Sequence, residues 1–313
     1  MELRMQDAHS TWRDRWVYWI VSTFGWWCRR IPKRWAMLLG WGIGMLYYHF
    51  VKKRREIALS NLQTAFRERF TTSECIEICK ASFINVGKTC IEFLRFPKLN
   101  TENIWQEVTV EGAANLHTAL AKGKGAIVFL PHFGNWELLS LVYGALIPDR
   151  AKAIAFPLKN ALLNAYIWGH RELMSLKLIP RNQAIRETLR ALRNNEAVGF
   201  FADQNAGPEG VFVDFLGKPA SAARAPVVLA RKTGAPLLFS LSIRQPDDQH
   251  SVYISTPIHV KPTDDFEQDI EVYTSQMLKQ LETYIHKYPE QWLWLHNRWK
   301  TQPADSEPRT ANR

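Results

Sequence analysis

The second half of the chain alternates short apolar runs with longer helical patterns, and this alternation restricts the fold more than any other feature. Four apolar runs are short enough to be buried strands: 126–130, 151–156, 176–179 and 197–202. Helical patterns separate them, over about 135–147, 160–174 and 183–195. This order predicts an α/β domain with parallel strands, because a crossover helix returns the chain to a parallel neighbour.

The chain beyond residue 205 predicts that the sheet is mixed. Further strands are expected at 211–215, 236–244 and 251–257, with a helix at 222–233 and a long helix at 266–287. The last two strands follow each other without a helix between them, as in an antiparallel pair. The predicted fold class is therefore α/β, with a mixed, mostly parallel sheet flanked by helices and sites at the carboxyl ends of strands.

The N-terminal region alternates apolar, aromatic segments with basic clusters. Apolar residues fill 16–28 and 35–51, and the basic clusters follow at 29–34 and 52–55. Such a pattern is typical of membrane contact on the cytoplasmic side. The second apolar segment is at the lower limit of about 17–25 residues for a spanning helix. Two helices that dip into the inner leaflet therefore fit as well as one that crosses, and two ordinary core helices are the alternative.

These patterns divide the chain into three parts. Residues 1–55 are expected to be a helical membrane-attachment segment, 56–300 the main domain, and 301–313 a polar, disordered tail. Helices are expected between 56 and 96. The four cysteines form no CxxC pair and have no histidines at zinc-finger spacing, so reduced structural thiols are expected at Cys28, Cys75, Cys79 and Cys90.

The best catalytic candidates lie in the stretch FLPHFGNWE, residues 129–137. His132 follows a predicted strand, and Pro131 with Gly134 breaks the chain before the next helix. Glu137 comes five residues after His132, about 140° away on a regular helix, so the two can pair only across a turn. A carboxylate beside an imidazole fixes the tautomer and makes a better base.

Several chemistries lack their usual motifs. The chain has no Walker A loop, no glycine-rich dinucleotide fingerprint and no GxSxG elbow. A histidine and a glutamate without a recognisable nucleophile indicate a base that acts directly on a substrate hydroxyl, as in acyl transfer. The formal charge of +10, from 40 Lys and Arg against 30 Asp and Glu, indicates an anionic partner. Nucleic acid, acidic protein and anionic lipid all satisfy the charge.

The motif HxxxxE, from His132 to Glu137, is similar to the HxxxxD/E motif of membrane glycerolipid acyltransferases. Over roughly 15–300 the chain resembles the late lipid A acyltransferases of Gram-negative bacteria. The resemblance rests on successive blocks: NLQTAF at 61–66, HFGNWE at 132–137, FPLKN at 156–160 with Arg171, IPR at 179–181, ADQ at 202–204, GVFVDFLG at 210–217 and PEQWLWLHNRWK at 289–300. Leu216 departs from the family pattern, which has a phenylalanine there.

The resemblance implies a glycerolipid acyltransferase-like fold for 56–300, the acyltransferase domain, and it implies a reaction. An acyl chain carried by acyl carrier protein passes to the hydroxyl of a 3-hydroxyacyl chain on a lipid A precursor, at the cytoplasmic face of the bacterial inner membrane. The expected partners are acyl carrier protein, the lipid A precursor and inner-membrane lipids, with no nucleic acid. No cofactor or metal is expected, since the acyl-phosphopantetheine is a substrate.

Roles for individual residues follow from the motif. His132 is expected to remove the hydroxyl proton, and Glu137 to orient and stabilise the imidazolium. The backbone at Gly134 and Asn135 is expected to donate hydrogen bonds to the charge that develops on the thioester oxygen. Arginine forks match phosphate geometry, so phosphate binding is the hypothesis for the arginines of the family blocks. The other predicted substrate-binding residues are Lys159, Asn160, Arg171, Arg181, Asp203, Gln204 and Arg224.

Alternatives stay open for several of these residues and for the function. Arg181 is as well explained by a solvated loop charge, and Asp203 with Gln204 by bracing of the active-site loop. The cluster of Trp292, Trp294 and Trp299 is interpreted as packing. Two other functions compete: acylation of another membrane lipid, such as a glycerolipid or a phosphoinositide mannoside, and lipid binding without catalysis.

Overall fold

The computed structural model describes residues 10–67 and 69–303, so the tail expected to be disordered lies outside the described residues from residue 304 onward. The α-helices are α1 Trp12–Arg30, α2 Lys33–Phe50, α3 Lys52–Phe66, α4 Thr72–Arg95, α5 Ala113–Ala121, α6 Leu138–Leu146, α7 Ala161–Arg171, α8 Ala184–Arg193, α9 Ala225–Thr233 and α10 Phe266–Lys287. The strands are β1 Val108–Glu111, β2 Ala126–Leu130, β3 Ala151–Ala155, β4 Lys177–Pro180, β5 Ala197–Phe201, β6 Val211–Phe215, β7 Lys218–Ala222, β8 Leu237–Arg244 and β9 His250–Ile254. Short 3-10 turns include η3 Arg181–Gln183 and η4 Pro289–Gln291.

A seven-stranded sheet forms the centre of the molecule, in the order β1-β9-β8-β2-β5-β3-β4. Five neighbouring strands, from β8 to β4, are mutually parallel, whereas β8 and β9 pair antiparallel. The prediction of a mixed, mostly parallel α/β sheet is therefore confirmed. A separate hairpin, β6 with β7, packs beside α10.

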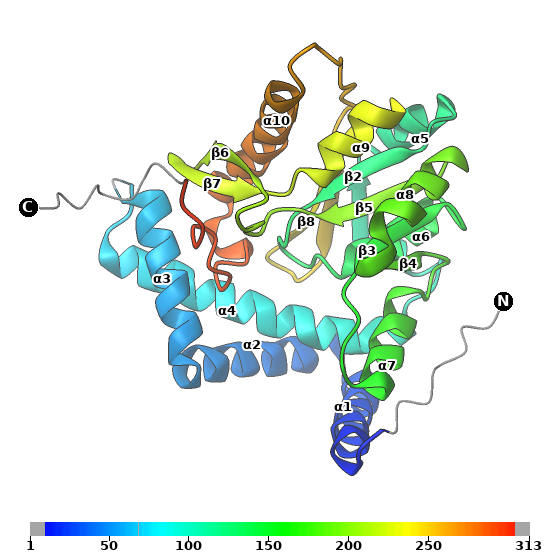
Figure 1. Ribbon diagram of the computed structural model, residues 1–313. Coiled ribbons are helices and arrows are strands. Elements are labelled where there is room, and N and C mark those ends of the chain that lie inside the picture. Colours follow the sequence, from blue (N-terminus) through cyan, green and yellow to red (C-terminus); the bar gives the residue numbers. More distant parts are fainter. Residues whose placement is uncertain (1–9, 68, 304–313) are drawn as a thin grey trace, which may run out of the picture.

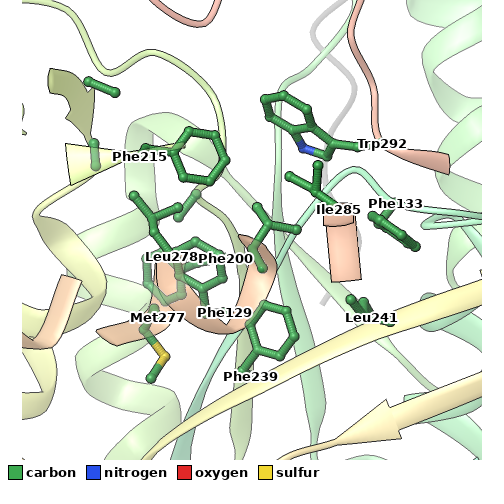
Figure 2. Packing of buried hydrophobic residues seen from close by; sticks show 14 of the residues in the cluster. Phe129, Phe133, Phe200, Phe215, Phe239, Leu241, Met277, Leu278, Ile285 and Trp292 are labelled. Atoms are coloured by element: carbon green, nitrogen blue, oxygen red, sulfur yellow. The ribbon is translucent and has the colours of Figure 1, made fainter. Parts of the chain in front are cut away.

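Alternating side chains of the central strands divide the core into two layers. On β2, Val128 and Leu130 face a cluster that includes α5 and α6, whereas Ile127 and Phe129 face a cluster with α9 and α10. The second cluster is rich in aromatic rings, as Figure 2 shows for Phe129, Phe239 and Phe215. Each fully buried ring of this kind contributes about 1.5–3 kcal/mol. Both faces of β2 are buried, which explains why its sequence is a continuous apolar run.

Helix α4 lies between the sheet and the N-terminal helices (Figure 1). It begins with a capping box in which Thr71 and Glu74 satisfy each other's backbone donors. Helix α2 approaches α4 very closely at Gly40, Gly44 and Gly87. A Cβ atom at Gly87 would lie 2.2 Å from the carbonyl oxygen of Gly40, so a larger residue there would force the helices apart.

Helices α1 and α2 expose many large apolar side chains, which is where the expected attachment segment lies. Trp19 is 63% exposed and Phe50 is 80% exposed. The other exposed aromatic side chains of this segment are Trp12, Trp16, Trp26, Trp27, Trp35 and Trp41. No helix in the described part of the chain is long and apolar enough to cross a membrane. The two helices pack against α4 and, for α1, also against α7.

Candidate active site

The turn after β2 carries the site and is held in an unusual backbone conformation. Gly134 has a φ of +55°, in the left-handed region that favours glycine. A Cβ atom at this position would lie 2.0 Å from the carbonyl oxygen of Ser242 on β8. Only glycine therefore allows the turn to pass this close to β8. Helix α6 begins at Leu138, three residues later than the predicted start near Asn135, and Glu137 occupies its N-cap position.

His132 is held by Asp203, which follows the neighbouring strand β5. The imidazole Nδ1 atom lies 2.8 Å from Oδ1 of Asp203, and the backbone N–H of His132 donates to Oδ2 at 2.9 Å. Because the carboxylate can only accept, the proton of a neutral imidazole must be on Nδ1, and Nε2 then has a free lone pair. No hydrogen bond to Nε2 exists among the residues that the structure describes. The arrangement is that of a general base and its orienting carboxylate.

Asp203 is almost fully buried, with 1% of its surface exposed, and it stays ionised through its partners. Burial raises the pKa of Asp203, but the charge of His132 and hydrogen bonds from His132 lower it. The indole Nε1 of Trp292 donates a further hydrogen bond at 2.9 Å. The net effect places the pKa of Asp203 below its ordinary value. Of the two roles anticipated for Asp203, these contacts correspond to bracing of the active-site loop.

The expected pairing of Glu137 with His132 differs from the contacts in the structure. Glu137 instead accepts two hydrogen bonds from Arg171, at 2.7 Å from Nε and 2.6 Å from Nη2. The pKa of Arg171 is lowered by burial but raised more by Glu137, so it lies above its ordinary value. The reason is geometric: Glu137, at the N-cap of α6, faces Arg171 of α7, whereas Nδ1 of His132 faces Asp203 after β5. Arg171 was expected to bind phosphate, but its guanidinium donates to the carboxylate of Glu137 instead.

A buried network behind the turn involves Gly134 and Asn135, whose backbone N–H groups were expected to act as oxyanion donors. The backbone N–H of Gly134 donates to the carbonyl of Gln291 at 2.9 Å, so it is not available to a substrate, and that prediction is wrong for this group. The side-chain amide of Asn135 donates to Glu92 of α4 at 2.8 Å. Glu92 in turn pairs with Arg244 at 2.6 and 2.7 Å. The network fixes the turn from the side of α4 and β8.

A cavity of about 400 Å³ opens beside His132, within the size range of small-molecule sites. It lies between the sheet and helices α6 and α7, and its wall is mostly apolar. His132, Glu137, Arg171 and Gln204 line one part of it. Further lining residues lie on the middle and amino-terminal parts of β2, β3 and β5 and on α6: Val128, Tyr143, Lys152, Ala153, Ala197 and Gly199. The cavity can hold a long apolar group with a reactive end near the imidazole.

The remaining predicted residues lie around the cavity or away from it. Asn160 caps α7 through Leu163 and donates to the carbonyl of Asp14, so its side chain is engaged in the fold. Arg181 stacks on the ring of Phe156, which lines the cavity, with its guanidinium carbon 4.3 Å from the ring centre. Lys159 is exposed on the loop after β3. Arg224 pairs with Glu267 at 2.5 Å and does not line the cavity.

Cysteines and possible metal ligands show no cluster in the described chain. Cys28, Cys75 and Cys79 are buried free thiols, and Cys90 is an exposed one. Within residues 10–67 and 69–303, no group of three or more His, Cys, Asp or Glu side chains is placed to hold a metal ion.

Sequence reasoning missed the residues that support the turn from a distance. Trp292 packs in the aromatic cluster, as expected, and also holds Asp203. Asn85 and Thr89 of α4 both donate to the carbonyl of Gly134, at 3.0 and 3.2 Å. Polar residues on the buried face of α4 were the available signal, because a buried amide or carboxylate needs a partner.

The chain is similar to known acyltransferases along most of its length. Residues 5–301 match the family described as bacterial lipid A biosynthesis acyltransferase. A lipid A biosynthesis palmitoleoyltransferase and a lauroyltransferase, both from Escherichia coli K12, are each 28% identical, with 92% of each chain covered. A phosphatidylinositol mannoside acyltransferase from Mycobacterium tuberculosis is 31% identical over 50% of this chain and 52% of its own length. A crystal structure of 1-acyl-sn-glycerophosphate acyltransferase from Thermotoga maritima aligns with a TM-score of 0.38 at 18% identity, covering 81% of this chain and 98% of that chain.

Proposed function

Since the chain belongs to the bacterial lipid A biosynthesis acyltransferase family, we propose that it transfers a fatty acyl chain from acyl carrier protein to a lipid A precursor. The acceptor is the hydroxyl of a 3-hydroxyacyl chain on that precursor. Family membership supports acyl transfer in lipid A biosynthesis; the donor, the acceptor hydroxyl and the mechanism are our proposal. The observation that carries it is the imidazole of His132, oriented by Asp203, beside a mostly apolar cavity.

The proposed reaction begins at Nε2 of His132. This atom accepts the proton of the acceptor hydroxyl while the hydroxyl oxygen attacks the thioester carbonyl carbon. The resulting tetrahedral intermediate collapses, the carbon–sulfur bond breaks, and the imidazolium returns its proton to the departing thiolate. Asp203 stabilises the imidazolium between these steps, since its carboxylate accepts from Nδ1. Proton and electron pairs therefore balance without any further reactant.

Residues beside His132 have supporting roles in this proposal. Gln204 lines the cavity next to the imidazole, and its side-chain amide is our candidate donor to the thioester oxygen as charge develops. The paired side chains of Glu137 and Arg171 form part of the cavity wall and keep its entrance rigid. Arg171 still has one nitrogen outside the fork, through which it can meet a phosphate of the precursor.

The acyl chain of the donor is proposed to occupy the cavity. Cavity-lining residues on β5 run from Phe201 back to Ala197, a distance of four residue steps or about 13 Å at 3.3 Å per step. An extended hydrocarbon chain advances about 1.25 Å per carbon, given bonds of about 1.5 Å. This length accommodates on the order of ten carbons. Each buried methylene contributes about 0.8 kcal/mol to binding.

We place the protein at the cytoplasmic face of the inner membrane, attached through α1 and α2. The exposed tryptophans of these helices alternate with arginines, such as Arg30 stacked on Trp26 at 4.5 Å. Aromatic side chains prefer the headgroup region, and basic ones favour anionic lipids. Helix α1 packs on α7, which carries Arg171 of the cavity wall, so a lipid acceptor would be close to its site.

The test of this function is mass spectrometry of lipid A from cells with and without the protein. Loss of the protein should leave a lipid A species lighter by one acyl chain, and a plasmid copy should restore the mass. A copy with His132→Ala, expressed at the same level, should not restore it. An unchanged lipid A profile after deletion would overturn the proposal.

A second acceptor has support from one comparison. The relative that acylates phosphatidylinositol mannoside, by its name, is 31% identical over half of this chain. The alternative is therefore acylation of a mannosylated phosphoinositide. Assays with purified protein should give product from the lipid A precursor and none from the mannoside or from lysophosphatidate. Faster product formation from the mannoside would favour the alternative.

A further inference from the structure

An arginine-rich surface on α8 lies outside the machinery described so far. We define the α8 surface by Arg181, Arg186, Arg190 and Arg193. The last three are spaced by four and three residues, so they lie on one side of the helix. The side chains of Arg186 and Arg190 are 78% and 74% exposed. In the described part of the chain, the single carboxylate that pairs with them is Glu187, at 3.1 and 4.0 Å.

The α8 surface adjoins the acyl cavity at its Arg181 end. Strand β4 ends at Pro180, the turn η3 carries Arg181, and α8 follows directly. Arg181 stacks on Phe156, which lines the cavity and is 61% exposed. Ile185, in the first turn of α8, is also exposed. An exposed apolar centre beside a basic rim is typical of a surface that binds an acidic protein.

We propose that the α8 surface docks the acidic carrier protein that delivers the acyl chain. The inference rests on the proposed function, because the donor thioester is attached to that carrier by a flexible arm. Helix α8 packs on β4 and β5 on the sheet face opposite the cavity. The arm of a carrier held there would pass the edge strand β4 beside Arg181 and Phe156 to enter the cavity. Opposite charges would also raise the rate of encounter.

Composition favours a protein over a membrane as the occupant. Helices α1 and α2 expose many tryptophan side chains, and tryptophan is enriched in the headgroup region of membranes. The segment 181–193 contains no aromatic residue, and Ile185 is its one exposed large apolar side chain; the ring at its edge is Phe156, on which Arg181 stacks. Separate surfaces for the lipid and the carrier also allow both substrates to reach His132 together.

The test compares two donors with one variant. The double variant Arg186→Glu/Arg190→Glu should lower kcat/KM for acyl carrier protein thioester at least about tenfold, chiefly through KM. With acyl-pantetheine, which lacks the carrier, kcat/KM should stay within about twofold of the unmodified protein. Added salt should lower kcat/KM of the unmodified protein for the carrier donor and should have little effect on kcat/KM of the variant. The matched control is Lys218→Glu/Lys287→Glu, which makes the same charge change on β7 and at the end of α10, outside the α8 surface.

Three results would overturn the docking proposal. The first is an unchanged kcat/KM of the α8 variant with the carrier donor. The second is an equal fall in its kcat/KM with both donors. The third is a fall in kcat/KM of the control variant as large as that of the α8 variant. Weaker binding of the variant to anionic vesicles, with unchanged KM for the carrier, would instead assign the surface to lipid. Failure of the proposed function looks different: the unmodified protein would then use acyl-pantetheine but not the carrier thioester.

Discussion

Nδ1 of His132 lies 2.8 Å from Oδ1 of Asp203, although 71 residues separate them in the chain. The parallel register of β2 and β5 explains this contact. Leu130 pairs with Phe201 at the strand ends, and each of the two functional residues lies two positions further on. Parallel strands end at the same edge of a sheet, so equal offsets bring the two side chains together.

Replacing Asp203 should lower activity while the protein still folds, because its main role is to orient the His132 base. Asp203→Asn keeps the size of the side chain but removes the charge that stabilises the imidazolium, so kcat should fall by about 10²–10⁴. Trp292→Phe removes just one hydrogen bond to Asp203 and should cost much less. The measurement is acyl transfer by purified variants with matched circular dichroism. Turnover by Asp203→Asn at the normal rate would reject Asp203 as the orienting residue.

The Glu137 and Arg171 pair should show a large energetic coupling. Both side chains are mostly buried, and two charge-assisted hydrogen bonds join them. A double-mutant cycle with Glu137→Gln and Arg171→Gln should give a coupling of about 1.5–3 kcal/mol in the free energy of unfolding. Urea titration of the unmodified protein, the two single variants and the double variant gives this coupling energy. Additive effects, with a coupling below about 0.5 kcal/mol, would mean that the fork is not formed in solution.

Strands with two buried faces could be predicted from sequence because burial leaves a continuous apolar run. Strand β2, buried on both faces, has the predicted bounds. The bounds of β6, which alternates buried and more exposed residues, and of helix α10 also agree with the prediction. Strand β1 was missed since it is short and alternates buried with exposed residues at the edge of the sheet. Helix α5 and strand β7 were also missed, being short elements without a strong period.

The contacts of the site depend on strand order, which periodicity does not contain. Strand β5 lies next to β2 although β3 and β4 come between them in the chain. A carboxylate five residues from His132 was therefore the nearer candidate, and the distant Asp203 became the partner only through that order. The contacts of Asn85 and Glu92 could not be predicted either, because their helix is far from the turn in sequence.

A larger side chain in the cavity should shorten the preferred acyl chain. Ala153 lines the cavity and pairs with Gly199, about midway along it. Ala153→Leu should remove room for at least two methylenes and lower kcat/KM for a dodecanoyl donor about tenfold relative to an octanoyl donor, at about 0.8 kcal/mol per methylene. Val198→Leu, on the opposite face of β5, is the matched control for overpacking. Equal chain preference in both variants would argue against the cavity as the acyl site.

The buried thiol of Cys79 should make stability depend on alkaline pH. Burial raises the pKa of Cys79 to about 12 from an ordinary value of 9.0. The unfolded chain loses this proton above pH 9 while the native protein keeps it, so the stabilisation is complete below pH 9 and is lost as the pH rises toward 12.

This one group should lower the free energy of unfolding by about 1.4 kcal/mol per pH unit in that window. Denaturant titrations at several pH values should therefore show a shallower pH slope for Cys79→Ala than for the unmodified protein. Tyrosines and lysines titrate in both proteins, so the difference in slope isolates the thiol. Identical slopes would contradict the raised pKa.

Acyl transfer by the purified protein is the decisive measurement for the proposed function. The protein is incubated with acyl carrier protein thioester and a lipid A precursor in detergent, and the product is weighed by mass spectrometry. Our account predicts a precursor heavier by one acyl chain, with the new ester on a 3-hydroxyacyl hydroxyl, and no such product from a folded His132→Ala variant. Transfer by that variant at the normal rate, or no transfer by the unmodified protein, would contradict it.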